Sequence, residues 1–250
     1  GVVGLTLEVL GDASVQIASE GKTATVKNTY TSTGSTPVKY NVYISKLAEG
    51  TDTGLSGATL QVKSADSGTY EKTWVSDGTV MTLQLEEGKY TLSELNPPAG
   101  YLAATAITFE VTDAGEVKVG GTAQAANKVT MYDKLKEYDV WISKQAVGGG
   151  AELKDAQLKV ESADGTYSET WISDGVNKKK LALKMGTYTL TENIAPNNYD
   201  IAESITFVVT ADGKVLVGGA EVTTKTVLML DKLKTKTVSL SKVDATNSDE

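Results

Sequence analysis

The sequence predicts an all-β fold made of β-sandwiches in tandem, and three observations lead to this prediction. The first is an internal repeat with a period of 98 residues. The second is that nearly every segment is short, rich in Val, Ile, Thr and Tyr, alternates in polarity, and ends at a Gly, Asp, Asn or Ser turn. The third is that about seven such segments recur in each stretch of about 100 residues, the strand density of a two-sheet sandwich. No segment shows the 3.6-residue period of a helix.

The repeat is visible in four pairs of predicted strands. The matching segments are YNVYISK (40–46) with YDVWISK (138–144), TWVSDG (73–78) with TWISDG (170–175), GKYTLSEL (88–95) with GTYTLTEN (186–193), and AITFEVT (106–112) with SITFVVT (204–210). A looser copy of the first motif is KTVSLSK at 236–242. These matches predict the following order: closing strands of a truncated preceding repeat (1–36), two complete domains (37–136 and 137–234), and the opening strand of a truncated following repeat (235–250).

Composition excludes several classes of chemistry. The chain has no histidine and no cysteine, which removes Ser-His-Asp and Cys-His nucleophiles, disulfides, and the usual zinc, copper and haem ligands. All 24 basic residues are lysine and the net charge is -8, which disfavours a nucleic-acid partner. No apolar run is long enough to span a bilayer, so we expect no membrane insertion in this chain. We expect neither a metal nor a cofactor.

Three charged residues in each repeat fall on the apolar face of a predicted strand. The two-residue period of a strand places Lys46 on the face of Val42 and Ile44, and the same parity turns Glu94 and Asp133 inward. The second repeat has the same three positions, at the same distances of 48 and 87 residues from the lysine: Lys144, Glu192 and Asp231.

An isolated buried charge is costly, so an inward lysine and two inward carboxyls must meet or lose their charges. Burial lowers the pKa of an amine and raises the pKa of a carboxyl, which gives a neutral nucleophile beside a neutral acid. Fixed near-attack geometry supplies an effective molarity of about 10⁵ M or more, enough for the pair to condense to an amide. The glutamate can relay protons and polarise the acid carbonyl. The alternative is a buried ion-pair network with no covalent bond.

The order of these residues resembles the CnaB-type (SpaA-like) domains of Gram-positive surface adhesins and pilins. The resemblance covers both repeats and rests on the opening-strand lysine, the glutamate of YTLSEL, the NPPAGY run at 96–101 and the closing-strand acceptor. It implies tandem inverted immunoglobulin-like (CnaB-type) β-sandwiches whose first and last strands are joined by an isopeptide bond. Carried over by motif, the bonds are Lys46 with Asp133 assisted by Glu94, and Lys144 with Asp231 assisted by Glu192.

The sequence departs from this pattern in several places. The tail after the second glutamate reads IAPNNY at 194–199. The acceptor in such domains is often Asn, whereas both repeats here use Asp, so the reaction would release water and not ammonia. Asn28 stands at the acceptor place of the leading fragment without a lysine, and Lys242 lacks an acceptor and a glutamate, so we expect neither to be bonded within this chain. There is no pilin-type lysine motif and no sorting signal, which favours a stalk over a pilus backbone.

Two other groups of side chains have a functional and a plainer interpretation. The pairs Tyr70 with Trp74 and Tyr167 with Trp171 could form platforms for sugars or peptides, but packing within the sandwich is the favoured interpretation. The run Lys178–Lys180 is interpreted as a solvated turn and not as a binding patch.

The resemblance implies a structural protein and not an enzyme, with bond formation as a single autocatalytic event in each domain. We expect stalk or spacer repeats of a bacterial cell-surface adhesin, monomeric, extracellular and anchored to the wall of a Gram-positive bacterium by a segment outside this sequence. The alternatives are a pilin shaft module and repeats that bind a host matrix protein or glycan directly. The candidate partners are therefore the host extracellular matrix and neighbouring repeats of the same protein.

Overall fold

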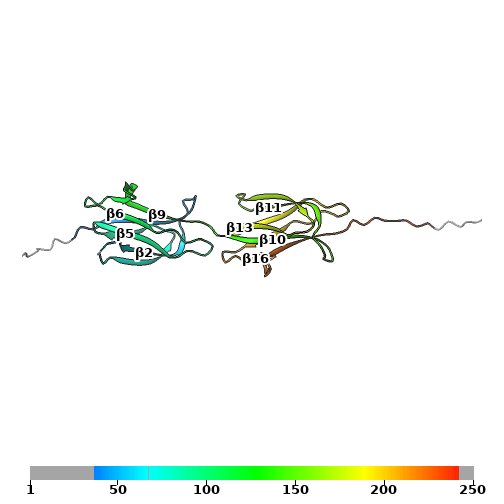
Figure 1. The fold of residues 1–250 in the computed structure, drawn as a ribbon, viewed down its shortest axis with the longest axis horizontal. Coiled ribbons are helices and arrows are strands. Elements are labelled where there is room, and N and C mark those ends of the chain that lie inside the picture. Colours follow the sequence, from blue (N-terminus) through cyan, green and yellow to red (C-terminus); the bar gives the residue numbers. More distant parts are fainter. Residues whose placement is uncertain (1–36, 67, 242–250) are drawn as a thin grey trace, which may run out of the picture. The chain divides into compact units, whose positions relative to one another are not determined.

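The computed structural model describes residues 37–66 and 68–241, which fold into two β-sandwiches of the same design (Figure 1). Each sandwich has one three-stranded and one six-stranded sheet. Within the described residues the sole helical element is a short 3-10 turn, η1 (Ala125–Asn127). The predicted all-β fold of tandem sandwiches is confirmed.

In the first sandwich the small sheet has the order β4-β1-β9 and the large sheet the order β3-β2-β5-β6-β7-β8. The strands of the small sheet are β4 (Met81–Leu85), β1 (Tyr40–Ala48) and β9 (Lys128–Asp133). Those of the large sheet are β3 (Glu71–Asp77), β2 (Ser56–Ser64), β5 (Gly88–Asn96), β6 (Ile107–Val111), β7 (Val117–Val119) and β8 (Thr122–Ala123). All four motifs predicted as strands in this repeat lie on strands.

The second sandwich repeats this topology, with the orders β13-β10-β18 and β12-β11-β14-β15-β16-β17. Its small sheet consists of β13 (Lys179–Lys184), β10 (Glu137–Ala146) and β18 (Thr226–Asp231). Its large sheet consists of β12 (Ser168–Asp174), β11 (Lys154–Ser162), β14 (Gly186–Ile194), β15 (Ile205–Val209), β16 (Val215–Val217) and β17 (Ala220–Glu221).

The opening strand of each sandwich pairs directly with the closing strand. β1 runs antiparallel to β4 on one side and parallel to β9 on the other. The parallel register pairs Lys46 with Met131 and therefore puts Asp133 two positions beyond the partner of the lysine. Because side chains alternate between the two faces of a strand, Lys46, Met131 and Asp133 all point to the inner face.

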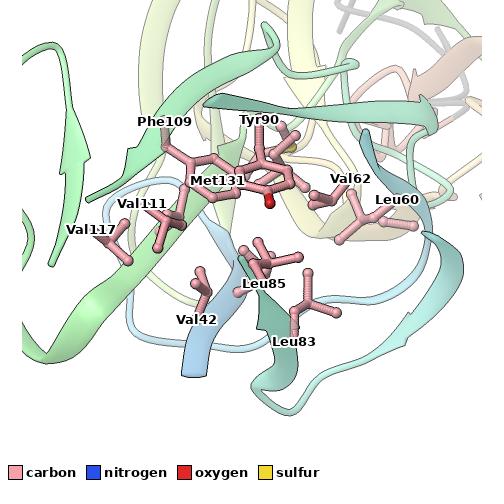
Figure 2. Close-up of a cluster of buried hydrophobic side chains, with 14 residues drawn as sticks. Val42, Leu60, Val62, Leu83, Leu85, Tyr90, Phe109, Val111, Val117 and Met131 are labelled. Carbon is pink, nitrogen blue, oxygen red and sulfur yellow. The ribbon is translucent and has the colours of Figure 1, made fainter. Parts of the chain in front are cut away.

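Apolar side chains from the two sheets fill the space between them. Figure 2 shows this core in the first sandwich, where side chains from β1 and β4 of the small sheet face those of β2 from the large sheet. The Tyr90 and Phe109 rings stack at a centroid distance of 5.6 Å. Burying one such side chain contributes about 1.5–3 kcal/mol, so the alternating pattern fixes which face of each strand is inside. Tyr70 and Trp74 pack against this core, as the packing interpretation predicts.

A tyrosine fixes the start of each opening strand to a turn of the large sheet. The Tyr138 hydroxyl donates to the carbonyl of Ala211 at 2.6 Å, and Tyr40 makes the equivalent bond to the carbonyl of Asp113. The Tyr138 ring lies on Gly213, whose φ of 77° and lack of a side chain leave room for the ring. The start of the strand that carries the buried lysine of each sandwich is thus tied to the opposite sheet.

The prediction for Lys178–Lys180 was wrong about the local structure. Lys179 and Lys180 belong to strand β13, which pairs antiparallel with β10. Lys179 Nζ lies 2.7 Å from Glu169 and Lys180 Nζ lies 2.9 Å from Asp139. The long-range strand pairing, together with these acidic partners, keeps a run of lysines extended where its charge alone suggests a turn.

The predictions for 1–36, including Asn28, lie outside the described residues, as does Lys242. Residues 235–241 are described, and they are exposed and form no strand. The two truncated flanking repeats and the exact domain limits therefore stay predictions. Across the described ranges, no helix has the length and apolar character needed to cross a bilayer.

Candidate functional site

A lysine and two carboxylates meet inside the first sandwich. Lys46 comes from β1 and Asp133 from the end of β9, while Glu94 reaches in from β5 of the facing sheet. Lys46 Nζ donates to Asp133 Oδ1 and lies 2.9 Å from Glu94 Oε1. The lysine side chain is 2% exposed and both carboxylates are 0% exposed. The structure thus brings together the three residues that strand parity predicts to point inward.

The second sandwich has the same arrangement. Lys144 Nζ donates to Asp231 Oδ1 and lies 2.9 Å from Glu192 Oε1. The lysine side chain is 1% exposed and the two carboxylates are again 0% exposed. Two copies with the same contacts and the same burial indicate a built site and not an accidental cluster.

A bulge in β5 helps to aim the first glutamate. β5 pairs with β2 so that Leu60 faces Glu94 while Thr59 faces Asn96, which leaves Leu95 as an extra, half-exposed residue. Such a bulge re-aims the neighbouring side chains and is common beside functional sites. β14 has the same irregularity at the second glutamate. Period-2 counting predicts the inward direction of the glutamate but does not reveal the bulge.

A backbone N–H holds each glutamate in place. Ala104 N–H donates to Glu94 Oε2 at 2.7 Å, and Ala202 N–H donates to Glu192 Oε2 at the same distance. Bonds from a backbone N–H to a carboxylate are among the stronger hydrogen bonds in proteins. They leave Oε1 of each glutamate facing the lysine. Sequence reasoning missed both alanines, because a main-chain donor leaves no signal in the residue type.

One oxygen of each carboxylate in the two triads lacks a hydrogen bond. Among the described residues, the buried side-chain oxygens without a partner are Glu94 Oε1, Asp133 Oδ2, Glu192 Oε1 and Asp231 Oδ2. The glutamate Oε1 atoms lie within ion-pair distance of the amine but accept no hydrogen bond. Asp133 Oδ2 and Asp231 Oδ2 have no hydrogen bond, since these aspartates contact the lysines through Oδ1. An unpaired buried acceptor costs about 1–3 kcal/mol, so the site as an ion pair leaves these oxygens unsatisfied.

Burial raises the pKa of Asp133 above its ordinary value. The hydrogen bond and charge of Lys46 act in the opposite direction, and the nearby Glu94 adds to the increase. The pKa of Asp231 is raised for the same reasons. A raised pKa favours the neutral acid, which is a better electrophile for an amine than a carboxylate is.

This shift predicts a pH dependence in a variant that cannot form the bond. In Lys46→Met, nothing opposes the effect of burial on Asp133, so its folded pKa stays above the unfolded value of about 3.9. The folded state then binds the proton more tightly, so this contribution to stability is complete below the unfolded pKa and is lost as the pH rises through the folded pKa. Lys46→Met/Asp133→Asn keeps every other titratable group, including Glu94, so we expect thermal unfolding of Lys46→Met to show a larger loss of stability from pH 4 to pH 8 than this double variant does. Identical pH profiles for the two variants would contradict the shift.

Comparison with known proteins finds a matching family and several similar proteins, among them a curated adhesin and a solved structure. The family model of the SpaA prealbumin-like fold domain matches the chain twice, at residues 40–124 and 138–221. The pilus tip adhesin Cpa of Streptococcus pyogenes is 45% identical over 75 residues, which are 29% of this chain and 11% of that protein. The solved structure of the Bacillus anthracis TIE protein is 25% identical, with a TM-score of 0.54, and the match covers 78% of this chain and 34% of that one. The chain therefore spans only a minor part of either relative.

The family matches include some of the site residues and not others. Both matches contain the lysine and the glutamate of their repeat, and both end before the aspartate. The prediction that Asp133 and Asp231 are acceptors is therefore supported by their contacts with the lysines and not by the family model.

Proposed function

Since the chain belongs to the family of SpaA prealbumin-like fold domains, we propose that each of its two sandwiches forms one internal isopeptide bond. The bonds join Lys46 to Asp133 and Lys144 to Asp231. The observation that carries the proposal is a fully buried amine in contact with a buried aspartate and a buried glutamate, present twice with the same geometry. Each bond forms once, so the protein does not turn over a substrate.

The proposed reaction is a condensation in which Glu94 moves protons. Starting from a neutral Asp133, the Glu94 carboxylate takes one proton from the Lys46 ammonium, and the free amine attacks Asp133 Cγ. Glu94 relays a second amine proton to the departing oxygen, so that the C–N bond forms, the C–O bond breaks and water leaves. The third proton stays on the amide nitrogen, and Glu94 ends protonated. Glu192 has the same role for Lys144 and Asp231.

The unpaired oxygens favour the covalent state over the buried ion pair. Condensation removes one Asp133 oxygen as water, and the protonated Glu94 can then donate from Oε1 to the new amide carbonyl. In the covalent state neither Asp133 nor Glu94 is then left with an oxygen that lacks a hydrogen bond, whereas Asp133 Oδ2 and Glu94 Oε1 lack one in the ion pair. The charges of the Lys46 ammonium and the Glu94 carboxylate also disappear from an interior in which a charge is costly.

The position of the bond suits a domain that carries tension. Force entering at the start of β1 would pass from Lys46 into Asp133, the last residue of β9, and leave the sandwich there. The two residues are 87 positions apart, so nearly the whole domain lies outside the loaded path. We therefore propose that the chain is a stalk or spacer module of an adhesin on the surface of a Gram-positive bacterium. Because the chain has no cysteine, the isopeptide bonds would supply the cross-links that disulfides supply in other extracellular proteins. The similarity to a pilus tip adhesin supports this setting.

The intact mass of the folded, purified chain tests the bond chemistry. We expect a mass below the sequence mass by two waters. Glu94→Gln and Glu192→Gln should each restore one water, and the double variant should restore both, because Gln keeps an acceptor for the alanine N–H but cannot relay protons. A wild-type mass equal to the sequence mass would exclude the covalent bonds.

A further inference from the structure

A fourth carboxylate binds the main chain of the lysine in the second sandwich. Glu152 lies between β10 and β11. Its Oε2 accepts the backbone N–H of Lys144 at 2.7 Å, and its Oε1 accepts the hydroxyl of Ser143 at 2.6 Å. The side-chain amide of Gln145 also donates to Oε1, at 3.4 Å. One side chain thus bonds three consecutive residues of β10, with the reactive lysine at their centre.

The first sandwich has no equivalent of this carboxylate. The position 98 residues before Glu152 is Gly54, which forms a β-bridge with Leu47. A Cβ atom on Gly54 would overlap the carbonyl oxygen of Gly78, so no side chain fits there. A main-chain bridge therefore stands in the first repeat where a carboxylate stands in the second.

Glu152 and Leu153 together hydrogen-bond both polar groups of the Lys144 backbone, its N–H and its carbonyl. Leu153 N–H donates to the Lys144 carbonyl at 2.7 Å, while Glu152 accepts the Lys144 N–H. A hydrogen bond to a charged acceptor is about twice as strong as a neutral one. A misplacement of about 1 Å between reacting groups can reduce a rate by about 10²-fold. The backbone from which the Lys144 amine reaches Asp231 is thus hydrogen-bonded through its carbonyl to Leu153 and through its N–H to Glu152.

Glu152 also borders the solvent beside this site. Lys144 and Glu152 line the same surface pocket of about 150 Å³, together with Trp171 and Lys179. Shortening Glu152 would extend this pocket toward the backbone of Lys144 and admit water. Water keeps an amine and an acid charged, which opposes condensation.

We propose that Glu152 is a positioning residue for the second isopeptide bond: it holds the Lys144 backbone for attack on Asp231 and limits the access of water. This inference rests on the proposed bond chemistry. It predicts that the two bonds of one chain differ in their dependence on this residue.

The test measures both bonds in the same molecules. The full chain is made by cell-free synthesis, samples are quenched in acid at intervals, and the linked peptides that contain Lys46 and Lys144 are quantified after digestion. In Glu152→Ala we expect the bond of Lys144 to form at least about 10-fold more slowly, with the bond of Lys46 unchanged. Glu152→Gln, which keeps an acceptor oxygen for the Lys144 N–H, should restore most of the rate.

A fold control separates positioning from stability. Glu192→Gln and Glu192→Gln/Glu152→Ala cannot form the second bond, so their unfolding temperatures show what Glu152 contributes to the fold alone. The rates of bond formation in the wild type and in Glu152→Ala are compared at a temperature at which both of these control variants are folded. An unchanged Lys144 bond rate in Glu152→Ala would overturn the positioning role while leaving the proposed function intact. Absence of both bonds in the wild type would overturn the proposed function and this inference together.

Discussion

Stretched from its two ends, the wild-type chain is expected to release no length from the bonded part of either sandwich. With the proposed bonds in place, tension would pass along β1 to Lys46, through the isopeptide bond to Asp133, and out of the domain. In Asp133→Ala the first sandwich has no bond, so its opening should release the 87 positions between the two residues. At about 3.4 Å per extended residue, this is roughly 300 Å. Optical-tweezers or atomic-force extension curves measure this length directly.

The second sandwich supplies the matched control. Asp231→Ala should release the same length, because Lys144 and Asp231 have the same separation, and the two substitutions together should give two steps. The alanine removes the electrophilic carbon without adding bulk to the core. A step of roughly 300 Å from the wild-type protein would contradict the proposed load path.

Replacing Glu94 with Gln is expected to lower the stability of the first sandwich by about 4–5 kcal/mol, the chain-entropy value for a cross-link that closes a loop of this length. Gln has nearly the volume of Glu and can accept the Ala104 N–H, so the packing and the local hydrogen bond are kept. What it removes is the proposed proton relay, and with it the proposed bond. For a domain of this size, the expected fall in unfolding temperature is roughly 20–30 °C.

A double-mutant comparison isolates the bond from the side chain. In Lys46→Met the bond is already impossible, so adding Glu94→Gln should have little further effect. Differential scanning calorimetry of the four proteins gives the coupling between the two positions. If Glu94→Gln lowered the unfolding temperature equally with and without Lys46, the glutamate would be a structural residue only.

The triads could be predicted from the sequence because two simple regularities coincide. The two-residue period assigns each strand position to a face, and the 98-residue repeat shows that the inward charges are conserved in spacing between the two copies. Lys46 on the face of Val42 and Ile44 is the clearest case, and its side chain is buried as parity requires. The alternation of polar and apolar residues is informative here because one face of each strand is buried in the core.

Features that depend on long-range geometry could not be predicted in the same way. The bulge at Leu95 arises from the pairing of β5 with β2, and the Ala104 N–H reaches Glu94 only because the loop returns beside it. The pairing of β13 with β10 likewise keeps Lys179 and Lys180 in a strand. None of these contacts has a residue-type signature. They follow from which segments the fold places side by side.

The most direct test of the isopeptide bond is the distance between Lys46 Nζ and Asp133 Cγ in a high-resolution crystal structure. The proposed bond predicts a planar amide with a C–N distance of about 1.33 Å, and the same for Lys144 and Asp231. Two resolved aspartate oxygens, with the amine at a hydrogen-bonding distance of about 2.7–2.9 Å from one of them, would show an ion pair and contradict it.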